Sequence, residues 1–318
     1  MADRESQISS KSRYREFCLQ ERDITIFSQP WWLDAISGDK EWDVCLIEKG
    51  GEVVASMPYV IKYRFGFKVC TMPKLTQTLG PYIKYPKGQK YYKRLSWEKK
   101  IMTEMIDQLP KVDYFSQNFN SSITNWLPFY WKDFKETTRY TYIIENIVPD
   151  DLDSIFENDI RRRIRKAIGL GVKTLESNDI EQLYKLSKQT FSRKGMKIPY
   201  DLDLVRNLYN CCRKNNAVKM FFAALDGVII AANFLVYDNN TVYYLMGGID
   251  PEKKDLGGMD MVQYEGIKFA LQSGRRYDFE GSMTEDIEKY FRSFGAVQRR
   301  FLNVEKYNSK LLKFRTLF

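Results

Sequence analysis

The sequence predicts an α/β fold built from two related units in tandem, each a mixed sheet flanked by helices. One order of elements (hairpin, strand, helix, strand, short helix, strand) occurs twice, within residues 42–145 and again within residues 219–305. A similar aromatic turn precedes the last strand of each copy, at residues 130–134 and 290–294. Alternating apolar residues indicate the strands, and apolar residues spaced by three and four indicate the helices.

The first unit is expected over residues 17–148, after a flexible polar lead at residues 1–16. Gln29-Pro30 breaks the pattern, and Trp31 begins a short helix. The other expected elements are a hairpin of residues 42–48 and 52–60, strands at 63–70, 112–115 and 135–145, and helices at 95–109 and 121–129.

The second unit is expected over residues 149–305, because Pro149 and an acidic pair mark a boundary. Asp226-Gly227 between two apolar runs is a strong hairpin signal. The expected helices are 152–169, 180–191, 202–215, 259–272 and 284–291, and the strands are 172–175, 219–225, 228–237, 241–248, 276–280 and 296–305. The tail, residues 306–318, is basic and apolar, and could form a terminal helix or meet a membrane surface or a partner.

Composition excludes several classes of site. The chain has no histidine, which excludes a Ser-His-Asp triad, a histidine base and a histidine-containing zinc site. Acid–base chemistry therefore falls to Asp, Glu, Tyr, Lys or Cys. Five cysteines without a Cys-x-x-Cys pair favour a reduced, cytoplasmic protein, and no metal is expected. The net charge of +9 favours anionic partners other than DNA, such as nucleotides, tRNA or lipid headgroups, although an ordinary solubilising surplus explains it equally well.

The turn at residues 250–258 has the features of a phosphate-binding site. A strand runs into a glycine-bearing basic loop that opens a helix, and a helix N-terminus attracts anions. We therefore expect Lys253, Lys254, Gly257 and Gly258 to contact the phosphates of a donor. The alternative is a solvated turn in which glycine only starts the helix.

The same stretch resembles the GNAT acyltransferase superfamily, in which such a turn holds the pyrophosphate of coenzyme A. The superfamily pattern is Gln/Arg-x-x-Gly-x-Gly/Ala; here Lys254 and Gly257 match its first two positions, and Met259 replaces the final small residue. The segments at residues 277–282 and 290–296 resemble the FemAB-like branch, which contains peptidoglycan-bridge aminoacyltransferases and related acetyltransferases. That branch usually has lysine where Arg292 stands.

The resemblance implies a set of site residues. Backbone N–H groups from Met246 to Gly248 would bind the donor carbonyl, and the acceptor amine would attack it directly. Glu280, which leads into the loop above the groove, would be the base rather than Asp278, and Arg292 would hold an anionic donor group. The residues expected to line the acceptor site are Gln77, Tyr82 and Arg193.

A basic run at residues 161–166 lies on the helix at 152–169. Its residues Arg162, Arg165 and Lys166 can share one face. We expect a solvated face with Ile160, Ile164 and Ile168 packed inward, although one or two of the cations could bind phosphate.

Three classes of function remain open. One is an acyl-CoA-dependent N-acyltransferase that acts on a sugar, an amino acid or a cell-envelope precursor, with acyl-CoA as donor substrate. Another is an aminoacyl-tRNA-dependent transferase that builds a peptide branch on a peptidoglycan precursor. The third is an inactive GNAT-like binding module. The phosphate-binding turn favours the first class, whereas Met259 and the basic net charge favour the second.

Overall fold

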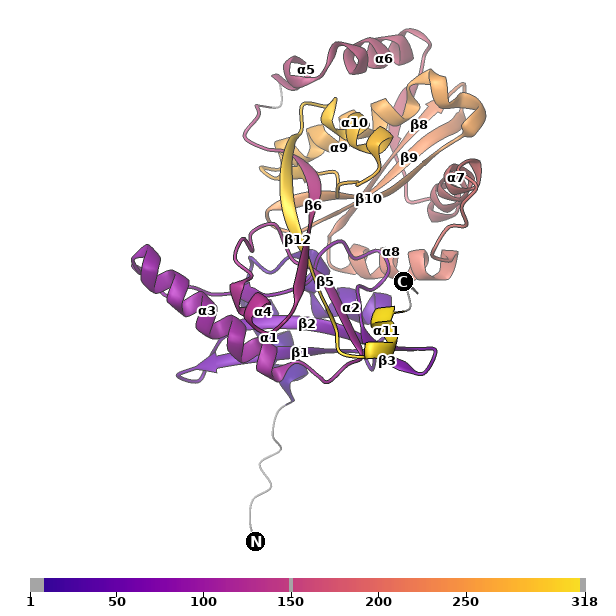
Figure 1. The fold of residues 1–318 in the computed structure, drawn as a ribbon. Helices are drawn as coiled ribbons and strands as arrows, with labels where there is room; N and C mark the ends of the chain where they lie inside the picture. The colour runs from indigo at the N-terminus through magenta and orange to yellow at the C-terminus, as the bar shows by residue number, and fades with distance from the viewer. Residues whose placement is uncertain (1–8, 149–150, 315–318) are drawn as a thin grey trace. The chain divides into compact units, whose positions relative to one another are not determined.

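The computed structural model describes residues 9–148 and 151–314, which form two compact units (Figure 1). Unit 1 comprises Met1–Arg139 and Phe301–Phe318, and unit 2 comprises Tyr140–Arg300. Pro149 predicted a unit boundary near residue 149, but the boundary between the units does not lie there. Residues 1–8 of the predicted lead, Pro149-Asp150 at the predicted boundary, and the end of the tail at 315–318 lie outside the described residues.

Unit 1 is a mixed sheet with helices. Its strands lie in the order β1-β2-β3-β5-β12, and β4 also pairs with β2. The pairs β1/β2, β2/β3 and β5/β12 are antiparallel, whereas β3/β5 is parallel. The elements are α1 (Ser10–Gln20), η1 (Ile26–Ser28), α2 (Pro30–Ser37), β1 (Trp42–Lys49), β2 (Glu52–Arg64), β3 (Phe67–Cys70), β4 (Tyr82–Ile83), α3 (Tyr91–Gln108), β5 (Tyr114–Asn118), α4 (Leu127–Trp131), the first part of β6 (Lys135–Ile144), the last part of β12 (Val297–Tyr307), and α11 (Lys310–Phe314).

Unit 2 repeats this plan. Its strands lie in the order β6-β11-β10-β9-β8-β7; β10/β11 is parallel, and β6/β11, β7/β8, β8/β9 and β9/β10 are antiparallel. Helix α9 packs its apolar side against β8 and β9 in the core of this unit. The elements are α5 (Leu152–Ile155), α6 (Asn158–Gly169), β7 (Lys173–Glu176), α7 (Ile180–Arg193), α8 (Leu202–Lys214), β8 (Val218–Leu225), β9 (Val228–Tyr237), β10 (Thr241–Ile249), η3 (Pro251–Leu256), α9 (Gly258–Gln272), β11 (Arg276–Asp278) and α10 (Glu285–Arg292).

The closing strands, β6 and β12, are the last strands of the two units predicted from sequence. They are exchanged: each pairs in the sheet of the other unit. In unit 1, β5 pairs with β12 from the end of the chain, with Asn303 opposite Asn118. In unit 2, β11 pairs with β6, with Tyr277 opposite Ile144. The predicted strand at residues 135–145 therefore exists, but it closes the sheet of the second unit instead of the first. This exchange places the unit boundaries inside β6 and β12.

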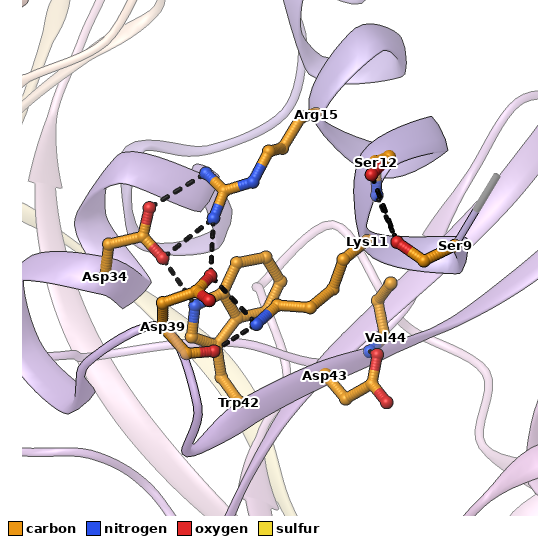
Figure 2. A network of polar contacts seen from close by, with 9 residues as sticks. All are labelled: Ser9, Lys11, Ser12, Arg15, Asp34, Asp39, Trp42, Asp43 and Val44. Carbon is orange, nitrogen blue, oxygen red and sulfur yellow. Dashed lines mark hydrogen bonds and ion pairs between the residues drawn. The ribbon is translucent and has the colours of Figure 1, made fainter.

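The polar lead predicted at residues 1–16 is wrong from residue 10 onward, where α1 begins. Tyr14 and Phe17 of this helix are buried. Figure 2 shows how charged side chains hold the helix in place: Arg15 donates to both oxygens of Asp34 at 2.8 and 3.0 Å, and Asp34 also accepts from Trp42 Nε1 at 2.8 Å. A polar sequence thus packs because its few apolar residues share one side.

Three further elements differ from the prediction. The expected helix at 152–169 is two helices, because the backbone breaks at Phe156, which is buried, and Glu157, whose N–H donates to Ser293 O. The expected helix at 121–129 begins later than predicted: the observed helix, α4, spans Leu127–Trp131 and has Pro128 in its first turn. The expected strand at 63–70 is interrupted by a two-residue turn between Arg64 and Phe67. Among the described helices, none is both long and apolar enough to cross a membrane.

Candidate functional site

The turn that leads into α9 is shaped by its close contact with α6. Gly257 has φ +76°, and a Cβ there would lie 3.0 Å from both the Ala167 Cβ and the Arg163 carbonyl oxygen. A Cβ at Gly258 would lie 2.8 Å from the Ile230 side chain on β9. Packing and backbone conformation therefore explain both glycines. Gly257 offers no side-chain cap, so the first amides of α9 remain without one.

A cavity of about 690 Å³ lies beside this turn, entirely within unit 2. Its lining comes from α6, α7, β10, η3, α9 and α10 and contains more positive than negative side chains. The basic lining residues are Arg162, Arg163, Lys166, Arg193 and Lys254, and the acidic ones are Asp255 and Asp260. Positive charge at an uncapped helix N-terminus is an arrangement that binds phosphate.

Asp260 is the buried acidic group of this cavity, and its charge is compensated. Its carboxylate accepts from Arg163 Nε at 2.8 Å and Nη2 at 3.1 Å, and from the Tyr290 hydroxyl at 3.0 Å. Burial and the nearby Asp260 charge raise the pKa of Tyr290 well above its usual value, so the phenol stays protonated. Sequence reasoning missed Asp260 and Tyr290, because ordinary core-facing spacing on α9 and α10 gave no local signal for either.

The remaining cations are less fully compensated. Lys166 Nζ donates only to the Asp255 carbonyl oxygen at 3.3 Å, and Arg162 has a solvent-exposed ion pair with Asp159. Arg193 and Lys254 make no side-chain hydrogen bond or ion pair with any residue in the described ranges. The cavity therefore has unbalanced positive charge available to an anionic ligand.

The basic face of α6 differs in part from the one predicted. Ile160 and Ile164 pack inward as expected, but Ile168 is 59% exposed, because α6 turns its buried side toward Ala167. Arg165, which was grouped with Arg162 and Lys166, instead donates to the Arg161 carbonyl oxygen on the surface.

Strands β10 and β11 separate next to this region. Their parallel pairing ends at Tyr243 opposite Asp278, while β10 continues to Ile249 with a register shift between Tyr244 and Met246. The edge of β10 beyond that point meets α7: Ser187 Oγ donates to Gly247 O at 3.1 Å, and a Cβ at Gly248 would lie 2.2 Å from the Leu186–Ser187 backbone. The contact with α7 thus explains why residue 248 lacks a side chain.

Glu280 lies just past β11, which is shorter than predicted and ends at Asp278. Its φ is +60°, and its N–H donates to Asp278 Oδ1 at 2.8 Å. Strand alternation would put the side chains of residues 278 and 280 on the same face, but β11 ends at Asp278, so Glu280 lies outside the strand. Burial, and secondarily the charge of Asp278, raise the pKa of Glu280 well above its usual value.

The other predicted site residues fall in different places. Lys254 and Arg193 line the cavity, whereas Lys253 and Arg292 are not among its lining residues. Arg292 is half exposed and donates to Glu288 Oε1 at 3.0 Å. Gln77 and Tyr82 belong to unit 1, where Gln77 O accepts from Asn118 Nδ2 and the Tyr82 ring packs edge-on against Phe17.

Residues 155–292, which lie within unit 2, match the family described as acetyltransferase (GNAT) domain. No curated protein matches the sequence significantly.

Solved structures show the same fold at low sequence identity. FemX shares 15% identity with a TM-score of 0.67, covering 95% of this chain and 97% of FemX. L-PGS from Bacillus licheniformis shares 10% identity with a TM-score of 0.54, covering 98% and 96%. The C-terminal domain of a putative lysylphosphatidylglycerol synthetase from Agrobacterium fabrum shares 10% identity with a TM-score of 0.51, covering 87% and 88%. Residues 155–292 thus match a GNAT domain, and the chain shares its fold with FemX.

Proposed function

We propose that the protein is an N-acyltransferase that binds the phosphates of an acyl-CoA donor in the cationic cavity of unit 2. The observation that carries this proposal is the placement of Lys254 and Arg193, both without ionic partners among the described residues, beside the uncapped N-terminus of α9. The GNAT domain at residues 155–292 supports acyl or aminoacyl transfer as the reaction class.

The rest of the donor would extend from this cavity along β10 toward the point where β10 and β11 separate. Backbone N–H groups between Met246 and Gly248 would stabilise the oxyanion that forms when the acceptor amine attacks the thioester carbonyl. The amine loses a proton, the tetrahedral intermediate expels the thiolate of coenzyme A, and the acyl group ends on nitrogen.

Glu280 is the proposed base for that proton. Its raised pKa makes it a better proton acceptor than an ordinary carboxylate, and no histidine competes for the role. Arg292 has no part in the proposal, because its guanidinium is half exposed and pairs with Glu288. The proposed acceptor class is an amine on a sugar, an amino acid or a cell-envelope precursor.

An aminoacyl-tRNA donor is the second candidate. The cationic lining continues onto the exposed Arg162, which would suit a polyanion larger than coenzyme A. The fold is also shared with a putative lysylphosphatidylglycerol synthetase, whose name describes the attachment of a lysyl group to a phospholipid.

Binding measurements separate the donors. Titration calorimetry with acetyl-CoA, free coenzyme A, uncharged tRNA and aminoacyl-tRNA should show micromolar binding of acetyl-CoA and coenzyme A. Lys254→Ala should weaken that binding about tenfold, the effect of losing one charge-assisted hydrogen bond. Lys253→Ala is the matched control, because the adjacent lysine does not line the cavity. Equal losses in both variants would refute the assignment, and binding of aminoacyl-tRNA alone would favour the second candidate.

Turnover is followed by the release of free thiol from acetyl-CoA in the presence of a panel of amines. Glu280→Gln should lower kcat at least about tenfold, or about 1.4 kcal/mol of barrier, without changing donor affinity. Donor binding without turnover on any amine would instead indicate an inactive binding module.

A further inference from the structure

The hairpin between β2 and β3 of unit 1 ends in two exposed aromatic rings. Tyr63 is 75% exposed and Phe65 is 87% exposed, and Phe65 is the most exposed large apolar side chain among the described residues. We call residues 63–66 the aromatic tip. Exposed aromatic rings at the end of a hairpin lack the hydrophobic stabilisation that a buried position would give them.

The backbone of the aromatic tip makes Phe65 more unusual. Arg64 pairs with Phe67, so the turn contains only Phe65 and Gly66, with φ values of +50° and +82°. Such two-residue turns favour Asn-Gly or Asp-Gly, because a bulky side chain is strained in the left-handed region. Folding alone would thus select asparagine at residue 65, and the phenylalanine needs another explanation.

Cations surround the aromatic tip. Arg64 and Lys74 are exposed, and Lys62 and Lys68 are partly exposed at the base of the hairpin. The pKa of Lys62 is lowered, first by its partial burial and further by Arg64 and Lys74, while Glu41 acts in the opposite direction. Lys62 therefore lies within electrostatic reach of Arg64 and Lys74 as well as of Glu41, and an anionic surface would add to the attraction that Glu41 supplies.

Helix α11 covers one face of this hairpin, the face that carries Lys62 and Arg64. Phe67 and Tyr307 pack against a small cluster formed by Val69, Tyr114 and Leu312, which joins α11 to the base of the hairpin (Figure 1). The adjacent Leu311 points the other way and is 56% exposed, next to the exposed Lys310 and Lys313. Both elements thus expose apolar and basic side chains together.

We propose that the aromatic tip and α11 dock unit 1 on the surface of an anionic phospholipid membrane. Phe65 at the turn and Leu311 would enter the headgroup region, where aromatic rings and apolar chains are favoured, and Lys62, Arg64 and the two lysines of α11 would bind lipid phosphates. A nucleic acid would use the cations, but it offers no apolar phase for Leu311. This inference does not depend on the donor or the chemistry of unit 2.

The test is co-sedimentation of the full chain with vesicles of phosphatidylcholine alone or with one quarter phosphatidylglycerol. Binding is expected only to the anionic vesicles and should weaken as NaCl rises. Phe65→Asn should lower the partition coefficient about tenfold, because it removes a large apolar side chain from the interface. The same variant should leave the melting temperature unchanged or raise it, because asparagine is favoured at that turn position.

Arg64→Gln should lower the partition coefficient about fivefold, the effect of one basic residue near an anionic membrane. Tyr91→Gln is the matched control: Tyr91 is 79% exposed beside Lys90 and Lys93 but lies on α3. Failure of the wild-type chain to bind anionic vesicles, or an equal loss in Tyr91→Gln and Phe65→Asn, would overturn the proposal. So would tighter binding to single-stranded RNA than to the vesicles, with that RNA binding lost in Phe65→Asn.

Discussion

Arg163 and Asp260 lie 97 residues apart in sequence and form a two-point ion pair, with Nε to Oδ2 at 2.8 Å and Nη2 to Oδ1 at 3.1 Å. The pair joins α6 to the first turn of α9 and fixes two walls of the cationic cavity. The Asp260 side chain is 6% exposed, so its carboxylate depends on Arg163 and the Tyr290 hydroxyl for compensation.

Arg163→Ala should lower the free energy of unfolding by about 2 kcal/mol, because the Asp260 carboxylate stays buried without a countercharge. The figure is below that of a fully buried pair, since the Arg163 side chain is 41% exposed. Arg162→Ala, on the same helix with an exposed partner, should cost no more than about 0.5 kcal/mol. Urea unfolding of both variants measures the difference, and similar losses would contradict the structural role of the Arg163 pair.

Glu280→Gln should change stability in a pH-dependent way. A carboxyl with a raised pKa in the folded state makes its full contribution to stability at pH values below its pKa in the unfolded state. That contribution is lost as the pH rises from the unfolded-state pKa to the folded-state pKa. The uncharged amide of the variant has no such loss. The free energy of unfolding of the variant, relative to that of the wild type, should therefore rise by up to about 1.4 kcal/mol per pH unit between about pH 4.5 and the folded-state pKa. Urea unfolding at pH 5 and pH 8 measures it, and a pH-independent difference would show that Glu280 is not perturbed.

Gly281→Ala should be strongly destabilising, because its Cβ would lie 2.1 Å from the Tyr140 carbonyl oxygen and its φ is +72°. Gly274 has a similar φ of +70° with nothing within 4 Å of the added Cβ. Gly274→Ala should thus cost only the left-handed backbone strain, about 1–2 kcal/mol. Thermal unfolding of the pair isolates the steric part, and equal melting temperatures would show that the loop after Glu280 can move away from Tyr140.

The exchange of closing strands predicts where the chain can be cut. A fragment of residues 140–300 should fold cooperatively, because it keeps the three buried residues of β6 that lie beside β11 (Tyr142, Ile143 and Ile144). A fragment of residues 149–300, cut at the boundary predicted from sequence, loses that strand and should unfold at a much lower urea concentration. Circular dichroism of the two fragments tests this, and equal midpoints would mean that β6 is dispensable.

Local chemistry explains why much of the fold could be predicted from the sequence. The hairpin at Asp226-Gly227 was placed correctly because a two-residue turn has a specific sequence preference. The helix at residues 259–272 followed from apolar spacing. In each case the determining residues are neighbours in sequence.

The features that the sequence did not predict depend on distant partners. β6 and β12 have similar strand patterns, so nothing local reveals which of them pairs with β5. The break at Phe156 and Glu157 is stabilised by Ser293, far along the chain. At the site, the positive charges of Lys254 and Arg193 were enough to predict them as binding residues. The role of Asp260 could not be predicted, because its partner Arg163 lies 97 residues away in sequence.

The strand exchange also has a consequence for how the protein is made. The antiparallel partner of β5 is β12, so unit 1 cannot complete its sheet until the end of the chain has been synthesised. At about 5–20 residues per second, the roughly 160 residues between Arg139 and Phe301 take about 10 to 30 s to appear. During that interval the nascent chain exposes an unpaired β5 edge, which is the kind of edge that chaperones cover and that promotes aggregation. Unit 1 therefore completes its sheet only after unit 2 has been synthesised.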